Sequence, residues 1–513
     1  MDYDIIFLNP FGFGYSGFSH GIATLSSILR NNGIKVSIID ASAEKLESKE
    51  VVLKVIREKP KIIGITGFIQ ASFFNKEVSD GIRNELPEVV QLAGGAWAEY
   101  TPEYILRKTK VDYVVRGEAD LIITNLIKAI INNELPHNIP GTSFLDKEQN
   151  YTENPPLEFP RHLDNLPFPA YDLFDMSYYI LNVKPEKYDF PLKKSLIRRI
   201  KKNSEDGNLR LVSITSGRGC YGRCDFCAAA NLMRRNFSPQ YLVDHMEYLM
   251  RTYNVNAFNF TESLTLSTRK WVKEFCDEII NRKLTVFYMP AARADFNYDS
   301  ETIKLLEDSG CITIGFGFES GDNLMLRSFN KKTTVERYYK VIEDFKKTSI
   351  AVGGSFILNM PGENYVSIGN TIKFIKNTKI VFSFGFAYPY PGSSLYRFAE
   401  SNSFCNLEDV MFKTLNKRLP SKTEFKEYID KYNFNNLNKM KLWKVNKYLY
   451  KLFDYNVLYN KNIVLYFLIR LFPFYFEIKK GLIYLKDFTF IFLRKLAKFL
   501  KIKKIIHGLK FKK

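Results

Sequence analysis

The sequence has few of the features that would place it in a specialised class of protein. Six cysteines among 513 residues are too sparse for a disulfide-stapled scaffold. The longest apolar stretch, 463–476, is interrupted by Arg470 and Pro473 and falls short of the ~20 residues that a membrane span needs. No succession of charged, apolar and small residues opens the chain, so we expect no signal peptide and a cytoplasmic, reducing location.

Acidic residues are scarce in one region only, the C-terminal fifth of the chain. Residues 411–513 contain 25 Lys and Arg against 6 Asp and Glu, so they carry the whole net charge of +19. The same segment is rich in aromatic and aliphatic residues. One interpretation is a helical cap whose lysines face solvent. The other is a surface that holds the protein to anionic lipid at the inner face of a membrane. We expect no nucleic-acid partner, because no motif of that kind accompanies the charge.

Residues 1–145 alternate short apolar runs with helical patterns. Apolar strands between helices indicate a parallel sheet covered on both faces, as in a doubly wound, Rossmann-like α/β domain. The strands are expected at Tyr3–Asn9, Ile34–Asp40, Lys61–Thr66, Val89–Ala93 and Tyr113–Val115. The helices are expected near His20–Asn32, Glu50–Glu58, Ala71–Glu85, Pro102–Lys108 and Leu121–Asn132.

Residues 146–208 lose that alternation. Five prolines lie between positions 155 and 169, and a charged run follows near Lys193–Asp206. Proline clusters of this kind mark connecting segments. We therefore interpret 146–208 as a proline-rich linker that packs against its neighbours.

Six β/α units in series follow in residues 209–400 and predict an open, partial (β/α)6 barrel with right-handed crossovers. Ligands of such sheets bind at the C-terminal strand ends. Residues 401–513 are expected to be mainly helical and basic. The barrel strands are expected at Leu211–Ser216, Ala257–Thr261, Thr285–Ala291, Ile312–Phe318, Ala351–Leu358 and Val381–Tyr388. The helices are expected near Gln240–Tyr253, Arg269–Arg282, Glu301–Ser309, Thr334–Lys347 and Tyr365–Asn377.

A cysteine triplet follows the first strand of this barrel. Cys220, Cys224 and Cys227 have the spacing C-x3-C-x2-C in a glycine-containing loop. Three thiolates bind three irons of a 4Fe–4S cluster and leave the fourth iron open. Zinc usually takes four protein ligands in paired C-x2-C groups, and scattered core thiols would not explain the spacing or the strand-end position. Nearby Arg218 and Arg223 could partly offset the cluster's negative charge.

This motif, with Phe226 before the last cysteine, resembles the radical S-adenosylmethionine superfamily. The resemblance implies that the open iron binds S-adenosylmethionine and that one electron cleaves it to a 5′-deoxyadenosyl radical. Strand-end polar residues then become candidate cofactor contacts, as does the glycine that precedes two of them. Single polar residues of this kind are as often ordinary caps or salt bridges. The candidates are Phe226, Glu262, Arg293, Gly317, Glu319 and Ser320.

The N-terminal domain offers two interpretations. Gly12, Gly14 and Gly17 form a G-x-G-x-x-G after the first strand, with Asp40 ending the next, which is a dinucleotide fingerprint. A Rossmann-like domain, a proline-rich linker and a radical barrel in series instead resemble the cobalamin-binding subgroup of radical S-adenosylmethionine enzymes, which we favour. No D-x-H-x-x-G is present to supply a cobalt ligand, and His20 is expected to cap or pack a helix. The strand-end residues that carry this resemblance are Thr66, Gly94, Gly95, Gly117 and Glu118.

The resemblance implies a cobalamin-dependent radical enzyme that acts on an unactivated carbon, most often by methylation. Ring formation or rearrangement is the alternative within the family, and a non-catalytic iron–sulfur sensor is the alternative outside it. The implied cofactors are a 4Fe–4S cluster, S-adenosylmethionine and cobalamin. The implied partners are a small-molecule or lipid-like substrate and a reductant protein of the flavodoxin or ferredoxin type.

Overall fold

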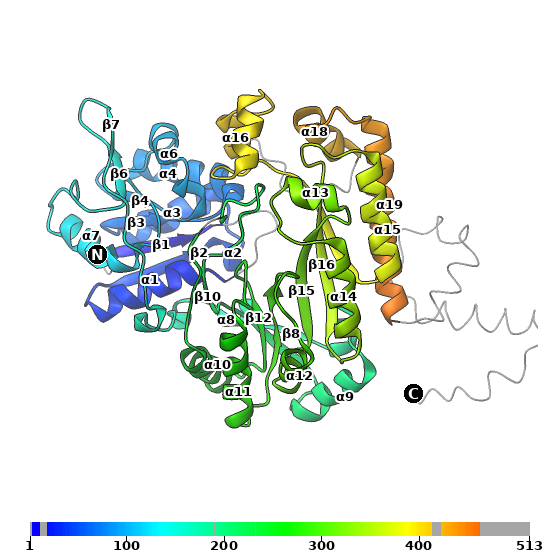
Figure 1. Cartoon of the computed structure of the whole chain (residues 1–513). Coiled ribbons are helices and arrows are strands. Elements are labelled where there is room, and N and C mark those ends of the chain that lie inside the picture. The colour runs from blue at the N-terminus through cyan, green and yellow to red at the C-terminus, as the bar shows by residue number, and fades with distance from the viewer. Residues whose placement is uncertain (1–2, 11–17, 189, 231, 413–421, 462–513) are drawn as a thin grey trace, which may run out of the picture. The chain divides into compact units, whose positions relative to one another are not determined.

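The computed structural model describes residues 3–10, 18–188, 190–230, 232–412 and 422–461 (Figure 1). Its first sheet has seven strands in the order β2-β1-β3-β4-β5-β6-β7. The first five strands pair in parallel, as the sequence predicts, and the last two pair antiparallel. The strands are β1 Ile5–Asn9, β2 Val36–Asp40, β3 Ile62–Ile65, β4 Val90–Ala93, β5 Tyr113–Val115, β6 Thr142–Leu145 and β7 Tyr151–Glu153.

Helices cover both faces of this sheet. Ile5 and Phe7 of β1 belong to one core cluster, while Ile6 and Leu8 belong to another. Every residue of β1 is therefore buried, and this is why the strand reads as a continuous apolar run. The helices are α1 His20–Asn31, α2 Ala41–Glu44, α3 Ser48–Glu58, α4 Ser72–Glu85, α5 Ala96–Glu99, α6 Pro102–Lys108 and α7 Ile123–Ile131.

The segment predicted as a linker contains more regular structure than the sequence pattern indicates. Strand β7 lies within it and extends the first sheet, and β8 Leu181–Val183 pairs antiparallel with the first barrel strand. Both strands pair antiparallel and lie outside the alternation of strands and helices on which the prediction depended. The helices α8 Met176–Tyr179 and α9 Lys194–Asn203 also lie in this segment.

The proline-rich part of the linker packs between α1 and the barrel helix α10 (Pro239–Tyr253). The ring of Tyr171 is fully buried and stacks on Phe18 with centroids 4.7 Å apart. Its hydroxyl lies 3.0 Å from Nε2 of His245 on α10. The backbone N–H of Ala170 donates to the carbonyl of Ala23 in α1. These contacts fix the N-terminal sheet and the barrel to the same linker.

The second α/β region forms the predicted barrel wall, in two sheets. Proline 290 has no N–H to donate and separates β13 from β14, so the strand expected at Thr285–Ala291 is divided. A single bridge between Tyr288 and Cys311 continues the wall across this break. The strands are β9 Leu209–Ile214, β12 Ala257–Phe260, β13 Phe287–Met289, β14 Ala291–Ala292, β15 Thr313–Glu319, β16 Ala351–Leu358 and β17 Val381–Phe386. The remaining barrel helices are α11 Arg269–Asn281, α12 Ser300–Asp308, α13 Asn323–Ser328, α14 Val335–Lys346 and α15 Tyr365–Thr378.

Strand β15 shows how the barrel divides its two faces. Phe316 and Phe318 are fully buried against the helix layer, where Phe318 contacts Tyr338 of α14 and Phe374 of α15. Gly315 and Gly317 alternate with them, and a Cβ added at Gly315 would meet nothing within 4 Å. Gly315 therefore leaves open space on the inner face of the wall.

The described C-terminal part is helical and packs against the last barrel strand. Phe386 of β17 contacts Phe425, and Tyr428 donates to the carbonyl of Ala387. None of the helices in the described residues is long and apolar enough to cross a membrane. The helices are α16 Ser394–Ser401, α17 Leu407–Phe412, α18 Lys422–Tyr432 and α19 Lys439–Lys461. The helical-cap interpretation is thus supported up to α19, and residues 462–513 lie outside the described residues.

We predict that Phe318→Ala lowers the free energy of unfolding by about 3–5 kcal/mol, because it leaves a cavity between β15 and two helices. Phe73→Ala is the matched control, since the Phe73 side chain on α4 is 58% exposed. Chemical denaturation of both variants and the parent measures the effect. Equal losses for the two variants would contradict the packing described for β15.

Candidate active site

The cysteine triplet lies in a loop that a short ribbon closes at both ends. Strands β10 (Gly217–Arg218) and β11 (Arg235–Asn236) pair antiparallel on either side of it. Gly219 has φ +80°, and a Cβ there would lie 2.2 Å from the carbonyl oxygen of Met233. Only glycine fits this turn, which brings the two ends of the loop together.

The three thiols of this loop are free to bind a metal group. Cys224 is buried, Cys220 and Cys227 are partly buried, and all three are free of disulfides. Burial raises the pKa of Cys227, and the charges of Cys224 and Cys220 raise it further. The loop therefore contains three free thiols, the number that binds three irons of a 4Fe–4S cluster.

Arg293 directly follows β14 and lies beside this loop. The sequence makes Arg293 a candidate contact of S-adenosylmethionine, whose carboxylate would suit a guanidinium. In the structure the guanidinium of Arg293 binds Asp295 instead, with Nε 3.0 Å from Oδ1 and Nη2 2.8 Å from Oδ2. Its Nη1 lies 3.5 Å from Sγ of Cys224. Arg293 is therefore held toward the cysteine loop.

Glu319 ends β15 and forms an ion pair that the sequence did not indicate. Its Oε1 accepts from Nζ of Lys331 at 2.9 Å, and both side chains are buried. A Cβ at Gly317 would lie 2.4 Å from Oε1 of Glu319, so that glycine makes room for the pair. Lys331 follows α13 in a turn with no recognisable motif, which is why sequence reasoning missed it.

The other two predicted contacts near this strand end have structural partners. The hydroxyl of Ser320 lies 3.1 Å from that of Thr371 in α15 and accepts from the N–H of Asp322. Phe226 packs edge-on against Phe329 with centroids 6.2 Å apart. Both residues stabilise the shape of the site, and their contact with a cofactor stays a prediction.

Glu262 follows β12 and has one carboxylate oxygen that no described residue binds. Its Oε1 accepts from the N–H and the hydroxyl of Ser216, and Nη2 of Arg234 lies 3.9 Å away. Its Oε2 is buried and has no hydrogen-bond partner in the described residues. Burial raises the pKa of Glu262. An unpaired buried carboxylate oxygen needs a partner, and the ammonium or ribose hydroxyls of S-adenosylmethionine would fit it.

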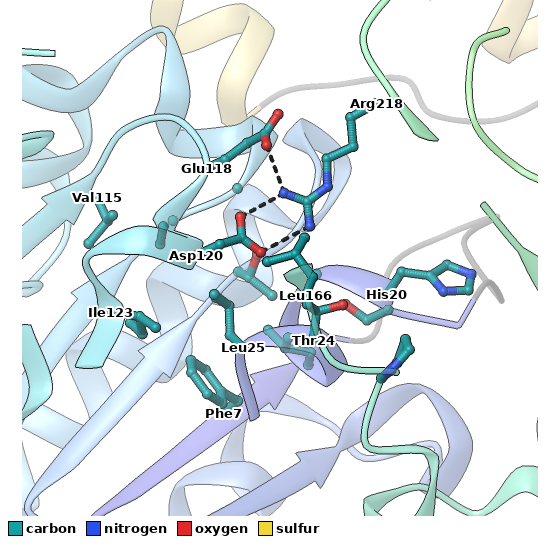
Figure 2. Close-up of a pocket in the computed structure, with 18 of the residues that line it drawn as sticks. Phe7, His20, Thr24, Leu25, Val115, Glu118, Asp120, Ile123, Leu166 and Arg218 are labelled. Atoms are coloured by element: carbon teal, nitrogen blue, oxygen red, sulfur yellow. Dashed lines mark hydrogen bonds and ion pairs between the residues drawn. The ribbon is translucent and has the colours of Figure 1, made fainter. Parts of the chain in front are cut away.

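A second site lies at the C-terminal edge of the N-terminal sheet (Figure 2). This cavity of about 340 Å³ is within the range of ligand pockets. Strand-end residues form one wall, and barrel residues Thr215, Gly217 and Arg218 contribute the opposite side. Gly95 has φ +77°, and a Cβ there would lie 2.5 Å from Oγ1 of Thr66. The wall residues that the sequence predicted are Thr66, Gly94, Gly95, Gly117 and Glu118.

Glu118 lines this cavity, but its carboxylate is already neutralised by arginines of the barrel. Nη1 of Arg218 lies 2.7 Å from Oε2 of Glu118 and 2.6 Å from Oδ2 of Asp120 (Figure 2). Arg235 binds both oxygens of Glu118 from the other ribbon strand. The guanidinium of Arg218, which could partly offset the cluster's charge, is thus bound by two carboxylates of the N-terminal domain. Arg223 is exposed.

His20 lies on the cavity wall at the start of α1. No side chain caps this helix, so the capping role expected for His20 is not observed, while its edge-on contact with Phe18 at 4.9 Å confirms the packing role. Burial and the charge of Arg218 lower the pKa of His20 to about 4, so the imidazole is neutral. Its Nε2 is buried with no partner in the described residues. A glycine-lined edge beside an unpaired imidazole fits a flat, polar-rimmed ligand such as a corrin. Gly12, Gly14 and Gly17 lie outside the described residues.

Comparison with known proteins agrees with both sites. A model of the radical SAM superfamily matches residues 214–375, and a model of the B12 binding domain matches residues 12–127. The uncharacterized methyltransferase PH0819 of Pyrococcus horikoshii is 27% identical over 76% of this chain and 80% of its own. The anaerobic magnesium-protoporphyrin IX monomethyl ester cyclase of Rubrivivax gelatinosus is 24% identical, over 73% of this chain and 65% of its own.

Two solved structures share the fold. The radical S-adenosylmethionine methyltransferase TsrM from Kitasatospora setae superposes with a TM-score of 0.62 at 16% identity, over 78% of this chain and 75% of that chain. The cobalamin-dependent S-adenosylmethionine radical enzyme OxsB superposes with a TM-score of 0.64 at 16% identity, over 92% of this chain and 75% of that chain.

An α/β chain with a B12-binding domain followed by a cysteine-loop barrel defines a class of cofactor-dependent enzymes. The chain combines a radical SAM domain with a B12-binding domain. It is an enzyme whose cofactors are a 4Fe–4S cluster, S-adenosylmethionine and cobalamin. The B12 assignment also decides between the two interpretations of the N-terminal domain, in favour of the corrin.

We predict that Glu118→Gln destabilises the chain by about 1–3 kcal/mol, because Arg235 and Arg218 lose a charged acceptor they share across domains. Glu103→Gln is the control, since its ion pair with Arg107 is half-exposed and contributes less than about 1 kcal/mol. Denaturation of the apo chain measures both losses. If Glu118→Gln costs no more than Glu103→Gln, the network does not fasten the two domains.

A buried carboxyl at the end of β16 predicts a pH dependence of stability. The Glu363 side chain accepts from the N–H of Asn359, while its Oε1 is buried without a partner in the described residues. Burial, and then the charge of Asp322, raise the pKa of Glu363 to about 8. Between its unfolded pKa of about 4.3 and 8, only the unfolded chain releases this proton. Stability from this group is therefore present at low pH and is lost as the pH rises.

We predict that Glu363→Gln stays neutral throughout and so shows a smaller loss of stability between pH 5 and pH 8 than the parent chain. Glu343→Gln is the control, because its side chain is 63% exposed. Unfolding free energies at the two pH values measure the difference. Parallel pH profiles for the parent and Glu363→Gln would show that this carboxyl ionises normally in the folded chain.

Proposed function

We propose that this enzyme methylates an unactivated carbon atom of its substrate. The observation that carries the proposal is that residues leading into the cysteine loop also line the corrin cavity. Thr215, Gly217 and Arg218 border the cavity, and Cys220 follows two residues later. Cobalamin, which would carry the methyl group, and the cluster, which would generate the radical, would therefore lie beside the same segment of chain. A substrate that reacts with both has to reach both.

The bound cofactors would supply a 5′-deoxyadenosyl radical and a cobalt-bound methyl group. The chain's own residues would position them. Cys220, Cys224 and Cys227 would hold the cluster. Glu262 would accept hydrogen bonds from the nucleoside ligand through its unpaired oxygen, and the Glu319–Lys331 pair would stand beside the open inner face at Gly315. The cofactor contacts of Phe226, Gly317 and Ser320 belong to the same proposal.

We assign these roles to the regions that the sequence suggested. Residues 1–145 would form the cobalamin-binding domain, 146–208 the linker, 209–400 the radical barrel and 401–513 a helical cap with a basic end. The two family models fall within the first and third of these ranges.

Methyltransferases among the relatives support methylation, and cyclases among them keep ring formation as the alternative. The methyltransferase PH0819 is more similar to this chain than the protoporphyrin ester cyclase, and its match covers 80% rather than 65% of the relative. Methyltransferases that act on bacteriochlorophyllide d and on a cytidylyl-2-hydroxyethylphosphonate also match. A small-molecule or lipid-like substrate and a flavodoxin- or ferredoxin-type reductant are consistent with this group. A basic C-terminus that rests on an anionic membrane surface would suit a lipid-like substrate.

The test is anaerobic incubation of the reconstituted protein with cobalamin, a strong reductant and S-adenosylmethionine carrying a CD3 group. We expect S-adenosylhomocysteine to be released, with deuterium recovered in the corrin fraction, because the first step of methylation needs no substrate. Replacing the three loop cysteines with alanine should abolish 5′-deoxyadenosine formation. Cys276→Ala is the control, since that thiol is buried in the core.

Two outcomes would contradict the proposal. Release of 5′-deoxyadenosine without S-adenosylhomocysteine or label in the corrin would favour ring-forming or rearranging chemistry. Absence of both products from a preparation with full iron and cobalt content would favour a sensor. Mass spectrometry of the nucleoside and corrin fractions separates these results.

A further inference from the structure

The buried side chain of Arg293 already has partners within the chain for most of its N–H groups. Asp295 binds its Nε and Nη2, and the carbonyl of Lys331 accepts from Nη2 at 3.0 Å. Its charge also lies over the ring of Tyr221, 5.5 Å from the centroid. A free S-adenosylmethionine carboxylate would have to displace Asp295 to bind this guanidinium in the bidentate way.

The remaining amino group of Arg293 faces the cysteine loop. Nη1 lies 3.5 Å from Sγ of Cys224. Within the same loop, a Cβ at Gly222 would lie 2.7 Å from Nη1 of Arg293 and 3.3 Å from Sγ of Cys220. Position 222 therefore has to be small for the guanidinium to reach the sulfur. The small residue at position 222 thus allows the guanidinium of Arg293 to contact the Cys224 sulfur.

We propose that Arg293 is a positioning residue of the iron–sulfur cluster, which donates a charge-assisted hydrogen bond to the Cys224 thiolate and makes the cluster easier to reduce. Hydrogen bonds to cluster sulfurs and the local charge set the reduction potential. A fixed cation stabilises the form with one more electron. This role replaces the direct contact with S-adenosylmethionine for which the sequence made Arg293 a candidate. It depends on the cluster of the radical domain and is independent of whether the enzyme transfers methyl groups.

The test is an EPR-monitored redox titration of the reconstituted cluster in three variants. Arg293→Met removes the charge and the donor, Arg293→Lys keeps the charge without the planar fork, and Arg223→Met removes an exposed arginine from the same loop. For Arg293→Met we expect the equilibrium constant of cluster reduction to fall about tenfold, which is 59 mV for one electron. Arg293→Lys should fall less, and Arg223→Met should match the parent. Affinity for S-adenosylmethionine, measured on the same samples, should not change.

The remaining outcomes would contradict the proposal or support it as follows. An unchanged midpoint potential in Arg293→Met overturns the proposal. If the potential is unchanged and this variant binds S-adenosylmethionine more weakly than the parent, Arg293 contacts the ligand instead of the cluster. If Arg293→Met cannot hold iron, Arg293→Lys decides alone: a lowered potential supports the role and an unchanged potential contradicts it. None of these readouts requires a substrate or a methylated product, so a failure here is distinguishable from a failure of the proposed function.

Discussion

The geometry of the active site depends on two arginines that lie opposite each other in one short ribbon. Arg218 and Arg235 are cross-strand partners in β10 and β11, and their charges would repel. Glu118 binds both, and Asp120 binds Arg218 a second time. The ribbon that closes the cysteine loop is therefore stabilised by carboxylates of the other domain. The same ion pairs therefore hold the cobalamin-binding domain against the barrel and stabilise the ribbon that closes the cysteine loop.

This arrangement explains why the two cofactor sites share a boundary. The turn that carries Glu118 follows β5, whose end lies at the edge where a doubly wound sheet binds its ligand. The ribbon follows β9, the first barrel strand, whose C-terminal end is where a barrel binds its ligand. The ion pair between Glu118 and Arg218 joins the turn after β5 to the ribbon after β9. The ligand-binding edge of the N-terminal sheet therefore lies beside that of the barrel, and residues of both line one cavity. Glycines at these edges then keep the space between them free of side chains.

Much of this fold could be predicted because it depends on periodic burial. The ends of all five parallel strands of the N-terminal sheet were located to within two residues, because each strand lies between helical patterns. The strands β6, β7 and β8 were not found, because they pair antiparallel and lie outside the alternation of strands and helices that located equally short strands such as β5. Pro290 is visible in the sequence. That it divides the third barrel strand into β13 and β14 could not be predicted, because a proline is also tolerated in a strand at the edge of a sheet.

The site was predictable as far as its motif extends. The cysteine spacing identified the loop, while the pairings around it come from residues distant in sequence. Glu118 was predicted to contact cobalamin, yet its partners Arg218 and Arg235 are about a hundred residues away. Lys331 belongs to no motif, and its role becomes visible only in the ion pair that it forms with Glu319 in the fold. Local sequence patterns report chemistry held within one loop, and they do not report which charges the fold brings together.

The charge balance around the cysteine loop explains how a charged ligand can bind there. Arg293 is paired with Asp295, Lys331 with Glu319, and Arg234 lies near Glu262, so each buried cation has its own carboxylate.

Because burying an unpaired charge costs several kcal/mol, this balance lets the site stay folded before any ligand arrives. A ligand with an ammonium group must then find an acceptor that no ion pair already uses. Among the described carboxylates beside the loop, Glu262 offers one, since its Oε2 is buried and unpaired and its cation is 3.9 Å away. Binding there gains a hydrogen bond without breaking a salt bridge, whereas binding at Asp295 or Glu319 would break one.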